Sequence, residues 1–400
     1  MQHGVEAVEA QGFGTVEIEP VLPGCPEDNE APLESRRGAA RDVAEAYDQQ
    51  LFHAGILATM HTVTIQPAGR QFQVEDGETV LAAALRQGLV LPYSCQSGAC
   101  GTCKGRIASG SVDYGVYQPR VFSDAEKAQG KALFCQARPL TDLVIEARTI
   151  SVAGGIDIKR LPCRVQKMER AADDVMLVSL KLPANEQLRF LAGQYLEFLL
   201  KDGAKRSFSM ANPPHDSEFL QLHVRRVAGG EFTRHVFEKM KERDILRLEG
   251  PFGTFFLRED SDKPIVFVAS GTGFAPIKSI IESALHKGIT RPMTLYWGGR
   301  RPKDLYLGGL AKQWPIHYIP VISESLPEDA WTGRTGFVHR AVMQDFPDLS
   351  GHQVYACGVP VMVDAARRDF TSTCRLPEDE FYADSFTTQA DLAQPATSPR

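Results

Sequence analysis

Four cysteines constrain the fold of this chain more than any other feature of its sequence. Cys95, Cys100 and Cys103 follow the spacing Cys-x4-Cys-x2-Cys, and Cys135 lies further along the chain. Three closely spaced ligands followed by one distant ligand is the pattern that binds a plant-type [2Fe–2S] cluster. The sequence therefore predicts a small domain that wraps around an inorganic core.

A structural zinc site is the alternative for these cysteines. Zinc sites usually combine two Cys-x2-Cys pairs, or mix Cys with His. Here one tight triplet precedes a single remote Cys, and no second pair occurs, so the iron–sulfur interpretation is favoured. Gly98 and Gly101 are expected to let the backbone turn so that N–H groups approach the sulfur atoms.

Length and charge limit the remaining possibilities. At roughly 150 residues per domain, a chain of 400 residues is expected to form two or three domains. The formal net charge is −6 and no strongly basic stretch occurs, which disfavours nucleic acid as a partner. No apolar run approaches the roughly 18 residues of a membrane span, and the N-terminus lacks a signal pattern. We therefore expect no membrane insertion and a cytoplasmic location.

The two ends of the chain differ from its middle. Residues 1–59 are rich in Glu, Ala, Gly and Pro and lack sustained periodicity, apart from a possible short helix near 43–51. They are interpreted as a disordered extension, and Met60, just before a clear strand, is an alternative start. Residues 391–400 are interpreted as a disordered tail.

Three stretches of the middle have different periodicities. Residues 60–152 alternate like a small β-rich domain and end at a hinge, Gly154-Gly155. Residues 158–258 contain evenly spaced short strands, which indicates a barrel or sandwich. From residue 263 to 390 strands alternate with helices, which is typical of an α/β domain with a parallel sheet.

Strands and helices can be assigned within these stretches. Thr79 is expected to cap a helix at 80–87 that ends before Gly88. The expected strands of the first two domains are 61–66, 72–74, 143–145, 164–168, 175–181, 195–200, 219–227 and 245–249. The third domain is expected to contain strands 265–269, 294–297, 317–321 and 353–356, with a helix at 277–286.

The second stretch contains several motifs that are each weak evidence alone. Their order along the chain indicates a cofactor site. Arg206 can bind a phosphate with two hydrogen bonds, Phe208 can stack on a ring system, and the Ser209 hydroxyl can bond a ring nitrogen. Downstream, Gly230 and Thr233 can present N–H and hydroxyl groups to a pyrophosphate. Tyr195 and Val224 complete this set of candidate cofactor contacts.

A glycine-rich turn follows the first strand of the third stretch. The segment Gly271-Thr272-Gly273, with Pro276, connects a buried strand to a helix. Such a turn places backbone N–H groups and the positive end of a helix against a pyrophosphate. The pattern is Gly-x-Gly-x-x-Pro, not the Gly-x-Gly-x-x-Gly dinucleotide fingerprint.

Together these motifs resemble the ferredoxin–NADP reductase superfamily. With the cluster first, the chain is similar to reductase components of bacterial oxygenases and most similar to CDP-6-deoxy-3,4-glucoseen reductases. The family's barrel motif is Arg-x-Tyr-Ser; Phe208 here keeps the stacking surface and loses the phenol hydroxyl. The resemblance implies a β-grasp ferredoxin domain, an antiparallel six-stranded flavin barrel and an α/β nucleotide domain. It implies a [2Fe–2S] cluster, FAD, and NADH or NADPH as cofactors.

The same resemblance assigns roles near the C-terminus. Cys357 and Gly358 match a Cys-Gly-x-Pro motif whose Cys lies beside the reacting nicotinamide carbon. The alternative for Cys357 is a small buried residue at a strand end. Phe386 is expected to shield the flavin face, and Ser209 and Cys357 are the candidate catalytic residues.

These roles define an expected electron path. NAD(P)H should reduce FAD, and electrons should pass through the cluster to a partner protein, either a sugar dehydratase or an oxygenase component. The alternative is a ferredoxin carrier fused to a degenerate reductase, which the intact motifs disfavour. NADH is the favoured donor, although Arg300 or Arg301 could pair with a 2′-phosphate.

Overall fold

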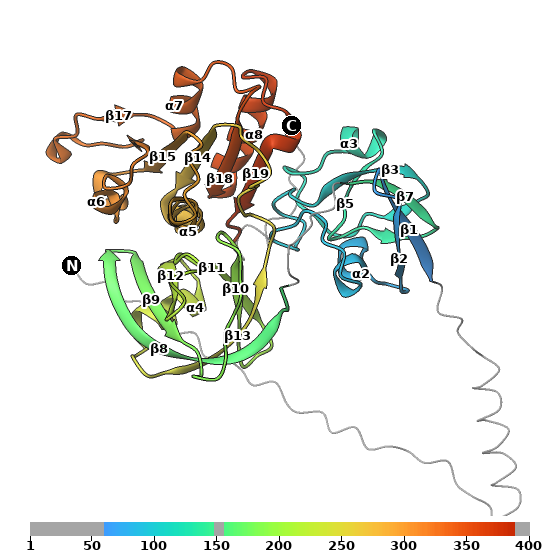
Figure 1. Cartoon of the computed structure of the whole chain (residues 1–400), viewed down its shortest axis with the longest axis horizontal. Helices are drawn as coiled ribbons and strands as arrows, with labels where there is room; N and C mark the ends of the chain where they lie inside the picture. The colour runs from blue at the N-terminus through green and yellow to red at the C-terminus, as the bar shows by residue number, and fades with distance from the viewer. Residues whose placement is uncertain (1–59, 148–155, 389–400) are drawn as a thin grey trace, which may run out of the picture. The chain divides into compact units, whose positions relative to one another are not determined.

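The computed structural model describes residues 60–147 and 156–388 (Figure 1). The predictions for residues 1–59, for Gly154-Gly155 and for 391–400 lie outside these described residues. The exact domain boundaries therefore stay predictions. Within the described ranges, no helix has the length and apolar character that crossing a bilayer requires.

The first domain is a mixed sheet in the order β2-β1-β7-β3-β5. Its strands are β1 (His61–Gln66), β2 (Arg70–Val74), β3 (Lys104–Ser109), β5 (Lys131–Leu133) and β7 (Leu143–Glu146). β1 pairs antiparallel with β2 and parallel with β7, while β3 is antiparallel to β7 and β5. With α2 (Val80–Arg86) against β2, this is the expected β-grasp fold. The smaller elements are β4 (Val112–Asp113), β6 (Arg138–Pro139) and α3 (Asp124–Ala128).

Helix α2 begins where the sequence predicted. The hydroxyl of Thr79 accepts a hydrogen bond from the N–H of Ala82 at 3.2 Å, which satisfies one N–H that the first helical turn leaves unpaired. Gly88 then adopts a φ of 72°, which ends the helix. The helix buries Val80 and Leu81 against the sheet, so its position depends on packing as well as on its cap.

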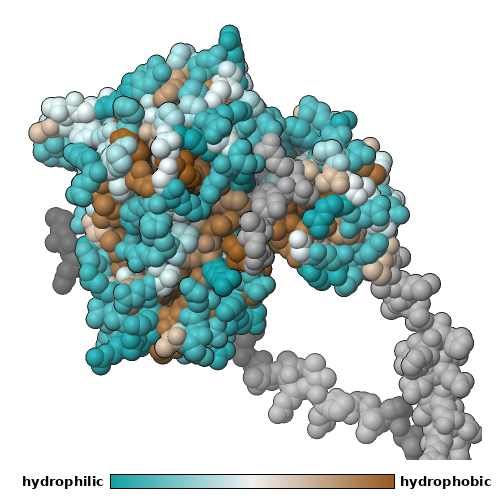
Figure 2. Space-filling model, in the orientation of Figure 1, coloured by the Kyte–Doolittle hydropathy of each residue, from teal (hydrophilic) through white to brown (hydrophobic). Residues whose placement is uncertain are grey.

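The second domain is a six-stranded antiparallel barrel in the order β11-β10-β13-β8-β9-β12. Its strands are β8 (Lys159–Ala172), β9 (Val175–Lys181), β10 (Tyr195–Leu199), β11 (Lys205–Ser209), β12 (Leu220–Arg225) and β13 (Ile245–Phe252). A bridge between Met210 and Leu222 brings β11 to β12 and closes the barrel. The visible outer face of the barrel is mainly hydrophilic (Figure 2), and α4 (Glu231–Glu238) lies beside β12.

Strand β8 is much longer than the expected strand at 164–168. Its first half pairs with β13 and its second half with β9. Register shifts at 165/167 and 170/172 bend the strand so that it can serve both partners. The sequence shows no single hydrophobic alternation across such a bend, which is why only its centre was predicted.

The third domain is a parallel sheet in the order β17-β16-β15-β14-β18-β19. Its strands are β14 (Ile265–Ser270), β15 (Met293–Gly299), β16 (His317–Ile322), β17 (Arg334–Thr335), β18 (Gln353–Gly358) and β19 (Phe381–Ser385). The first strand, β14, lies between β15 and β18, so the chain order reverses there. Ligands of open α/β sheets bind at such a switch point, at the carboxyl ends of the strands.

Helices cover both faces of this sheet. They are α5 (Phe274–His286), α6 (Gly308–Ala311), α7 (Val338–Asp345) and α8 (Pro360–Ser372), with short 3-10 turns η1 (Gly271–Gly273), η2 (Pro302–Asp304), η3 (Pro327–Asp329) and η4 (Glu378–Glu380). Hydrophobic side chains of α5 pack in one core cluster and those of α7 and α8 in another. Helix α5 begins before the expected residue 277, because the glycine turn continues directly into it and a first helical turn tolerates Pro276.

Candidate functional site

The four predicted cluster cysteines lie together as two pairs. The thiols of Cys95 and Cys100 form a hydrogen bond, as do those of Cys103 and Cys135. Within each pair the hydrogen bond lowers the pKa of one thiol, to about 5 for Cys95, and raises the pKa of the other. Two pairs of thiols can provide two ligands for each iron, which is the donor set that a two-iron cluster needs.

Backbone N–H groups surround these sulfur atoms. The N–H of Ser97 lies 3.4 Å from the Cys95 sulfur, and the N–H of Gly98 hydrogen-bonds the Cys135 sulfur. Gly98 and Gly101 adopt positive φ angles of 70° and 73°, as expected from their position between the ligands. N–H dipoles directed at sulfur stabilise negative charge on the cluster, so the loop fits a [2Fe–2S] group.

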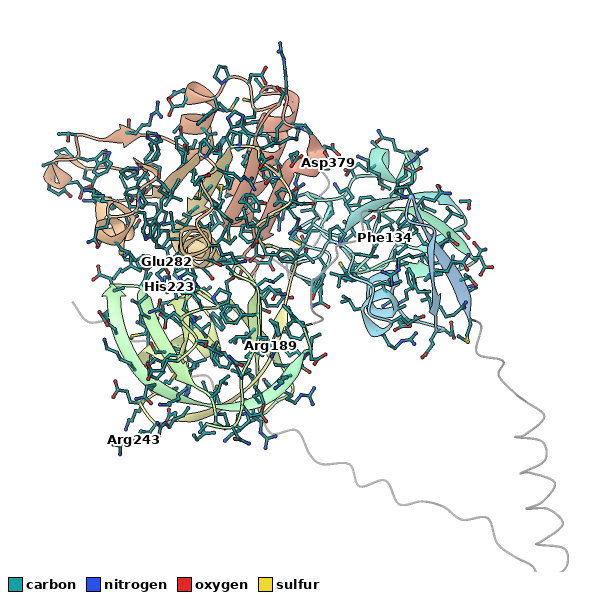
Figure 3. All side chains as sticks on the ribbon, viewed as in Figure 1. Phe134, Arg189, His223, Arg243, Glu282 and Asp379 are labelled. Atoms are coloured by element: carbon teal, nitrogen blue, oxygen red, sulfur yellow. The ribbon has the colours of Figure 1, made fainter. Side chains whose placement is uncertain are left out.

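Packing within the first domain holds the remote cysteine in place. Phe134, which precedes Cys135, is only 2% exposed and lies flat against Gly105 of β3, where a Cβ would overlap its ring. Its N–H donates to the carbonyl of Cys103 at 3.0 Å. Phe134 lies inside this domain in Figure 3. The loop and the distant ligand are therefore tied to one another by backbone contact.

The geometry also bears on the zinc alternative. Among residues 60–147 and 156–388, no three His, Cys, Asp or Glu side chains converge as ligands of a single ion. The thiols are distributed as two pairs, which suits ligands placed around two irons.

Two of the predicted flavin residues, Arg206 and Phe208, lie on strand β11 of the barrel. Phe208 of β11 is half-buried and packs near Phe198 and Phe232, with ring centroids 5.8 and 5.5 Å away. Arg206 donates to the carbonyl of Lys205 at 2.8 Å, and no carboxylate pairs with it in the described part of the chain. An aromatic ring and an uncommitted guanidinium on one strand fit a ring system with a phosphate tail.

Gly230 and Thr233 lie at the beginning of α4. The Thr233 hydroxyl accepts from the N–H of Val227 at 3.2 Å and donates to the carbonyl of Gly230 at 3.1 Å. Val224, on the preceding strand, has its side chain in the barrel core. The structure therefore uses the Thr233 hydroxyl to shape the turn, and backbone groups remain the candidates for pyrophosphate contact.

Residues 92–103, which contain Cys95, Cys100 and Cys103, form the cluster loop. Tyr195 lies where the barrel meets this loop. Its hydroxyl donates to the carbonyl of Ser94 at 2.8 Å and accepts from the side chain of Gln96 at 3.1 Å. Nearby, the N–H of Tyr93 donates to the Thr254 hydroxyl at 2.9 Å. These contacts attach the cluster loop to the barrel, which sequence reasoning did not foresee.

The two nucleotide motifs meet at the switch point of the parallel sheet. A Cβ at Gly273 would overlap the peptide between Cys357 and Gly358, and a Cβ at Gly358 would overlap Ser270. Gly358 has a φ of 146°, so two close approaches and a special backbone conformation all require glycine. Gly271, Thr272 and Pro276 follow in the same turn and helix. The predicted Gly-x-Gly turn and Cys-Gly turn thus form one surface.

Asp384 is the residue that sequence reasoning missed. It lies on β19 opposite Cys357, is buried, and accepts hydrogen bonds from the hydroxyls of Ser94 and, at 3.4 Å, Ser209. Burial raises the pKa of its carboxyl to about 6. A carboxylate inside the apolar segment 381–386 was the available signal, because buried polar groups are the informative exceptions. Phe386 follows, and its N–H donates to the Gly358 carbonyl at 2.8 Å.

Two further side chains connect the barrel to the nucleotide turn. Arg225 pairs with Asp174 at 2.7 Å, and its guanidinium covers Gly271. His223 is buried beside α5 (Figure 3), and its Nδ1 lies 3.0 Å from the Tyr306 hydroxyl. Burial lowers the pKa of His223 to about 3, so the imidazole is neutral at ordinary pH.

The two arginines after β15 have different environments. Arg301 binds both carboxylate oxygens of Asp329, at 2.5 and 2.8 Å, and reaches Glu328 at 3.2 Å. Arg300 has a side chain that is 64% exposed and approaches Asp304 only to 3.9 Å. Arg301 is therefore held by the carboxylates of Asp329 and Glu328, whereas the Arg300 side chain is largely exposed.

Comparison with protein families agrees with the three folds. A "2Fe-2S iron-sulfur cluster binding domain" matches residues 63–140, an "Oxidoreductase FAD-binding domain" matches 162–257, and an "Oxidoreductase NAD-binding domain" matches 267–368. The matches follow the chain in the same order as the three domains described above.

Full-length relatives show the same combination. The chain is 39% identical over 329 residues to CDP-6-deoxy-L-threo-D-glycero-4-hexulose-3-dehydrase reductase of Yersinia pseudotuberculosis, covering 81% of this chain and 98% of that protein. It is 37% identical over 335 residues to terephthalate 1,2-dioxygenase reductase component 2 of a Comamonas species, covering 82% and 98%. The solved structure of an Amycolatopsis cytochrome P450 reductase is similar, with a TM-score of 0.65, 35% identity, and 82% and 99% coverage.

Proposed function

Because the chain belongs to the ferredoxin-first reductases of the ferredoxin–NADP reductase superfamily, we propose that its hydride site and its cluster site are joined at Asp384. The protein is an oxidoreductase that passes electrons from NAD(P)H through FAD and a [2Fe–2S] cluster to a partner protein. The observation that carries the proposal is that one buried carboxylate binds Ser94, next to a cluster cysteine, and Ser209 of the flavin motif.

We assign residues to each group as follows. The cluster ligands are Cys95, Cys100, Cys103 and Cys135. The FAD contacts are Tyr195, Arg206, Phe208, Ser209, Val224, Gly230, Thr233 and Phe386. The nucleotide contacts are Gly271, Thr272, Gly273, Pro276, Cys357 and Gly358. When bound, FAD would accept the hydride from the nucleotide and the cluster would transfer single electrons. The protein would supply their positions and electrostatic surroundings.

Each residue of the hydride site has a defined task. Cys357, fully buried at the end of β18, presents a neutral thiol, because burial raises its pKa well above the ordinary value. A neutral, fixed thiol orients a nicotinamide ring by contact, not by charge. Ser209 offers a hydroxyl that Asp384 holds in one direction, so that a ring nitrogen meets a prepared hydrogen-bonding group.

The acceptor is a protein of one of two classes. The relatives described above include a reductase named for a hexulose dehydrase and a reductase named for a dioxygenase. We propose that this chain reduces the metal centre of one such component. The reducing interior of the cell is the proposed location, because the four cluster thiols must remain reduced to bind iron.

NADH is the proposed donor. The Asp329 carboxylate already binds Arg301 with two hydrogen bonds, so this guanidinium is not free to receive a 2′-phosphate. NADH should therefore give the higher kcat/KM. Asp329→Ala should release Arg301 and raise kcat/KM for NADPH several-fold relative to NADH. An NADPH preference in the native enzyme would overturn the proposal and assign Arg300 or Arg301 to the site.

Anaerobic stopped-flow reduction tests the proposed function as a whole. Mixing with NADH should bleach the flavin absorbance first, and the electron paramagnetic resonance signal of a reduced [2Fe–2S] cluster should follow. Supplying a dehydrase or an oxygenase component should then reoxidise the cluster in only one case. A protein that NADH does not bleach would instead be a ferredoxin carrier with a degenerate reductase. Metal analysis that finds zinc, and neither iron nor acid-labile sulfide, would overturn the ligand assignment.

A further inference from the structure

The nucleotide domain contacts the cluster loop from two elements. Arg120 forms an ion pair with Asp364 of α8 at 2.6 Å and donates to the carbonyl of Ala99 at 3.0 Å. The Thr102 hydroxyl donates to the carbonyl of Ala383 on β19 at 3.2 Å. The two contacts lie on either side of the loop segment that contains a cluster cysteine. This segment therefore rests against the carboxyl-terminal part of the chain.

Arg367 is close in the chain to one of these contacts and touches the strand that makes the other. It follows Asp364 by three residues on α8, so the two side chains lie on the same face of the helix. Its guanidinium lies 4.6 Å from the ring of Phe381, the first residue of β19. The side chain is therefore bounded by the helix and strand that hold the loop around Cys100.

The guanidinium of Arg367 has no hydrogen bond or ion pair with any residue in 60–147 or 156–388. Its neighbours are paired: Arg368 binds Asp369 at 2.8 Å, and Asp364 binds Arg120. Burial lowers the pKa of Arg367, and among the nearby acidic groups whose charge would oppose this fall Cys100 contributes most, followed by Asp364. A partly buried cation without an anionic partner is unfavourable unless a nearby negative charge compensates it.

We propose that Arg367 raises the reduction potential of the cluster that Cys100 helps to bind. The proposal rests on the ligand assignment made under the proposed function. A two-iron cluster with four thiolates gains one negative charge when it is reduced, so a fixed cation stabilises the reduced form more than the oxidised form. Arg367 belongs to the nucleotide domain, which would thus set part of the driving force for a step that ends in the ferredoxin domain.

Redox titration of the cluster tests this inference. Arg367→Met keeps an apolar chain over Phe381 and removes the charge, so the equilibrium constant for reducing the cluster should fall about tenfold, or ~59 mV for one electron. Arg367→Gln should give the same shift, and Arg367→Lys should retain most of the native potential. Arg368→Gln, which removes a neighbouring exposed arginine, is the matched control and should change nothing. Flavin reduction by NADH should keep its native rate in all four variants.

The outcomes separate the inference from its premise. Equal potentials in native protein and both neutral variants would overturn the role of Arg367 while leaving the cluster assignment intact. A native protein without any cluster signal would overturn the ligand assignment instead. If both neutral variants fail to load the cluster and Arg367→Lys loads it, the charge serves cluster binding and the proposal is wrong. Equal shifts in the lysine and neutral variants would indicate lost packing, which also contradicts it.

Discussion

The cluster site and the hydride site of this protein are built in opposite ways. Three of the four candidate cluster ligands come from one loop, and Phe134 ties the fourth to that loop inside the same domain. The proposed hydride site instead combines Ser209 of the barrel with Cys357 and Asp384 of the nucleotide sheet. A local site should fail independently of the rest, whereas an assembled site should transmit damage between domains.

Loss of a cluster ligand gives the largest expected effect. Cys103→Ser should abolish most reduction of cytochrome c or of the partner protein, because the exit for single electrons is lost. The same variant should still oxidise NADH with ferricyanide, a small acceptor that takes electrons from flavin directly. Unchanged FAD content and an elution volume equal to that of the native protein are the controls. A folded, FAD-loaded variant that reduces the partner at the native rate would disprove the proposed electron path.

Removal of the buried Cys357 thiol should have a smaller effect, and it should act on flavin reduction instead of on the cluster. Cys357→Ala should slow flavin reduction by NADH about 10- to 100-fold, because a small misplacement of the nicotinamide is costly. FAD should remain bound, and the cluster should be unaffected. Stopped-flow absorbance measures the rate. An unchanged rate would show that Cys357 only fills space at the end of β18.

Asp384 is the point where the two sites should respond together. Its carboxyl has a pKa raised to about 6 by burial, so it is ionised above that pH and protonated below it. The carboxylate accepts from both Ser94 and Ser209. Protonation turns one of its oxygens into a donor and weakens these hydrogen bonds, so electron transfer from flavin to cluster should slow as the pH falls through about 6. Asp384→Asn should remove this inflection and hold the step several-fold below the native rate at pH 8. Unchanged FAD and cluster content at the same pH values serves as the control. An inflection that persists in the asparagine variant would contradict the assignment.

Deleting residues 1–59 should have the smallest effect. The segment lacks the motif residues and the sustained periodicity of a core-forming sequence. NADH oxidation and cluster content of a protein that begins at Met60 should stay close to those of the full chain. A large loss of iron after truncation would show that this segment supports the cluster site.

The contrast between the two sites also explains what the sequence could predict. Cysteine spacing predicts the cluster ligands because neighbouring residues must surround one compact group. The Gly-x-Gly turn and the Cys-Gly motif were recognisable separately, but their contact depends on β14 and β18 pairing in parallel. The hydrogen bond from Ser94 to Asp384 and the ion pair between Arg120 and Asp364 could not be predicted, because they exist only once β19 and α8 lie against the cluster loop.

The position of β19 near the end of the chain has a consequence for biosynthesis. Domains fold largely from the N-terminus while the ribosome is still at work, so the ferredoxin sheet can form early. Asp364, Ala383 and Asp384 emerge long afterwards, and only then can the cluster loop gain its contacts with the nucleotide domain. During synthesis the ferredoxin domain is therefore complete before its contacts with the proposed hydride site can form. A product that terminates before β18 would keep the four cluster cysteines and lack Cys357 and Asp384.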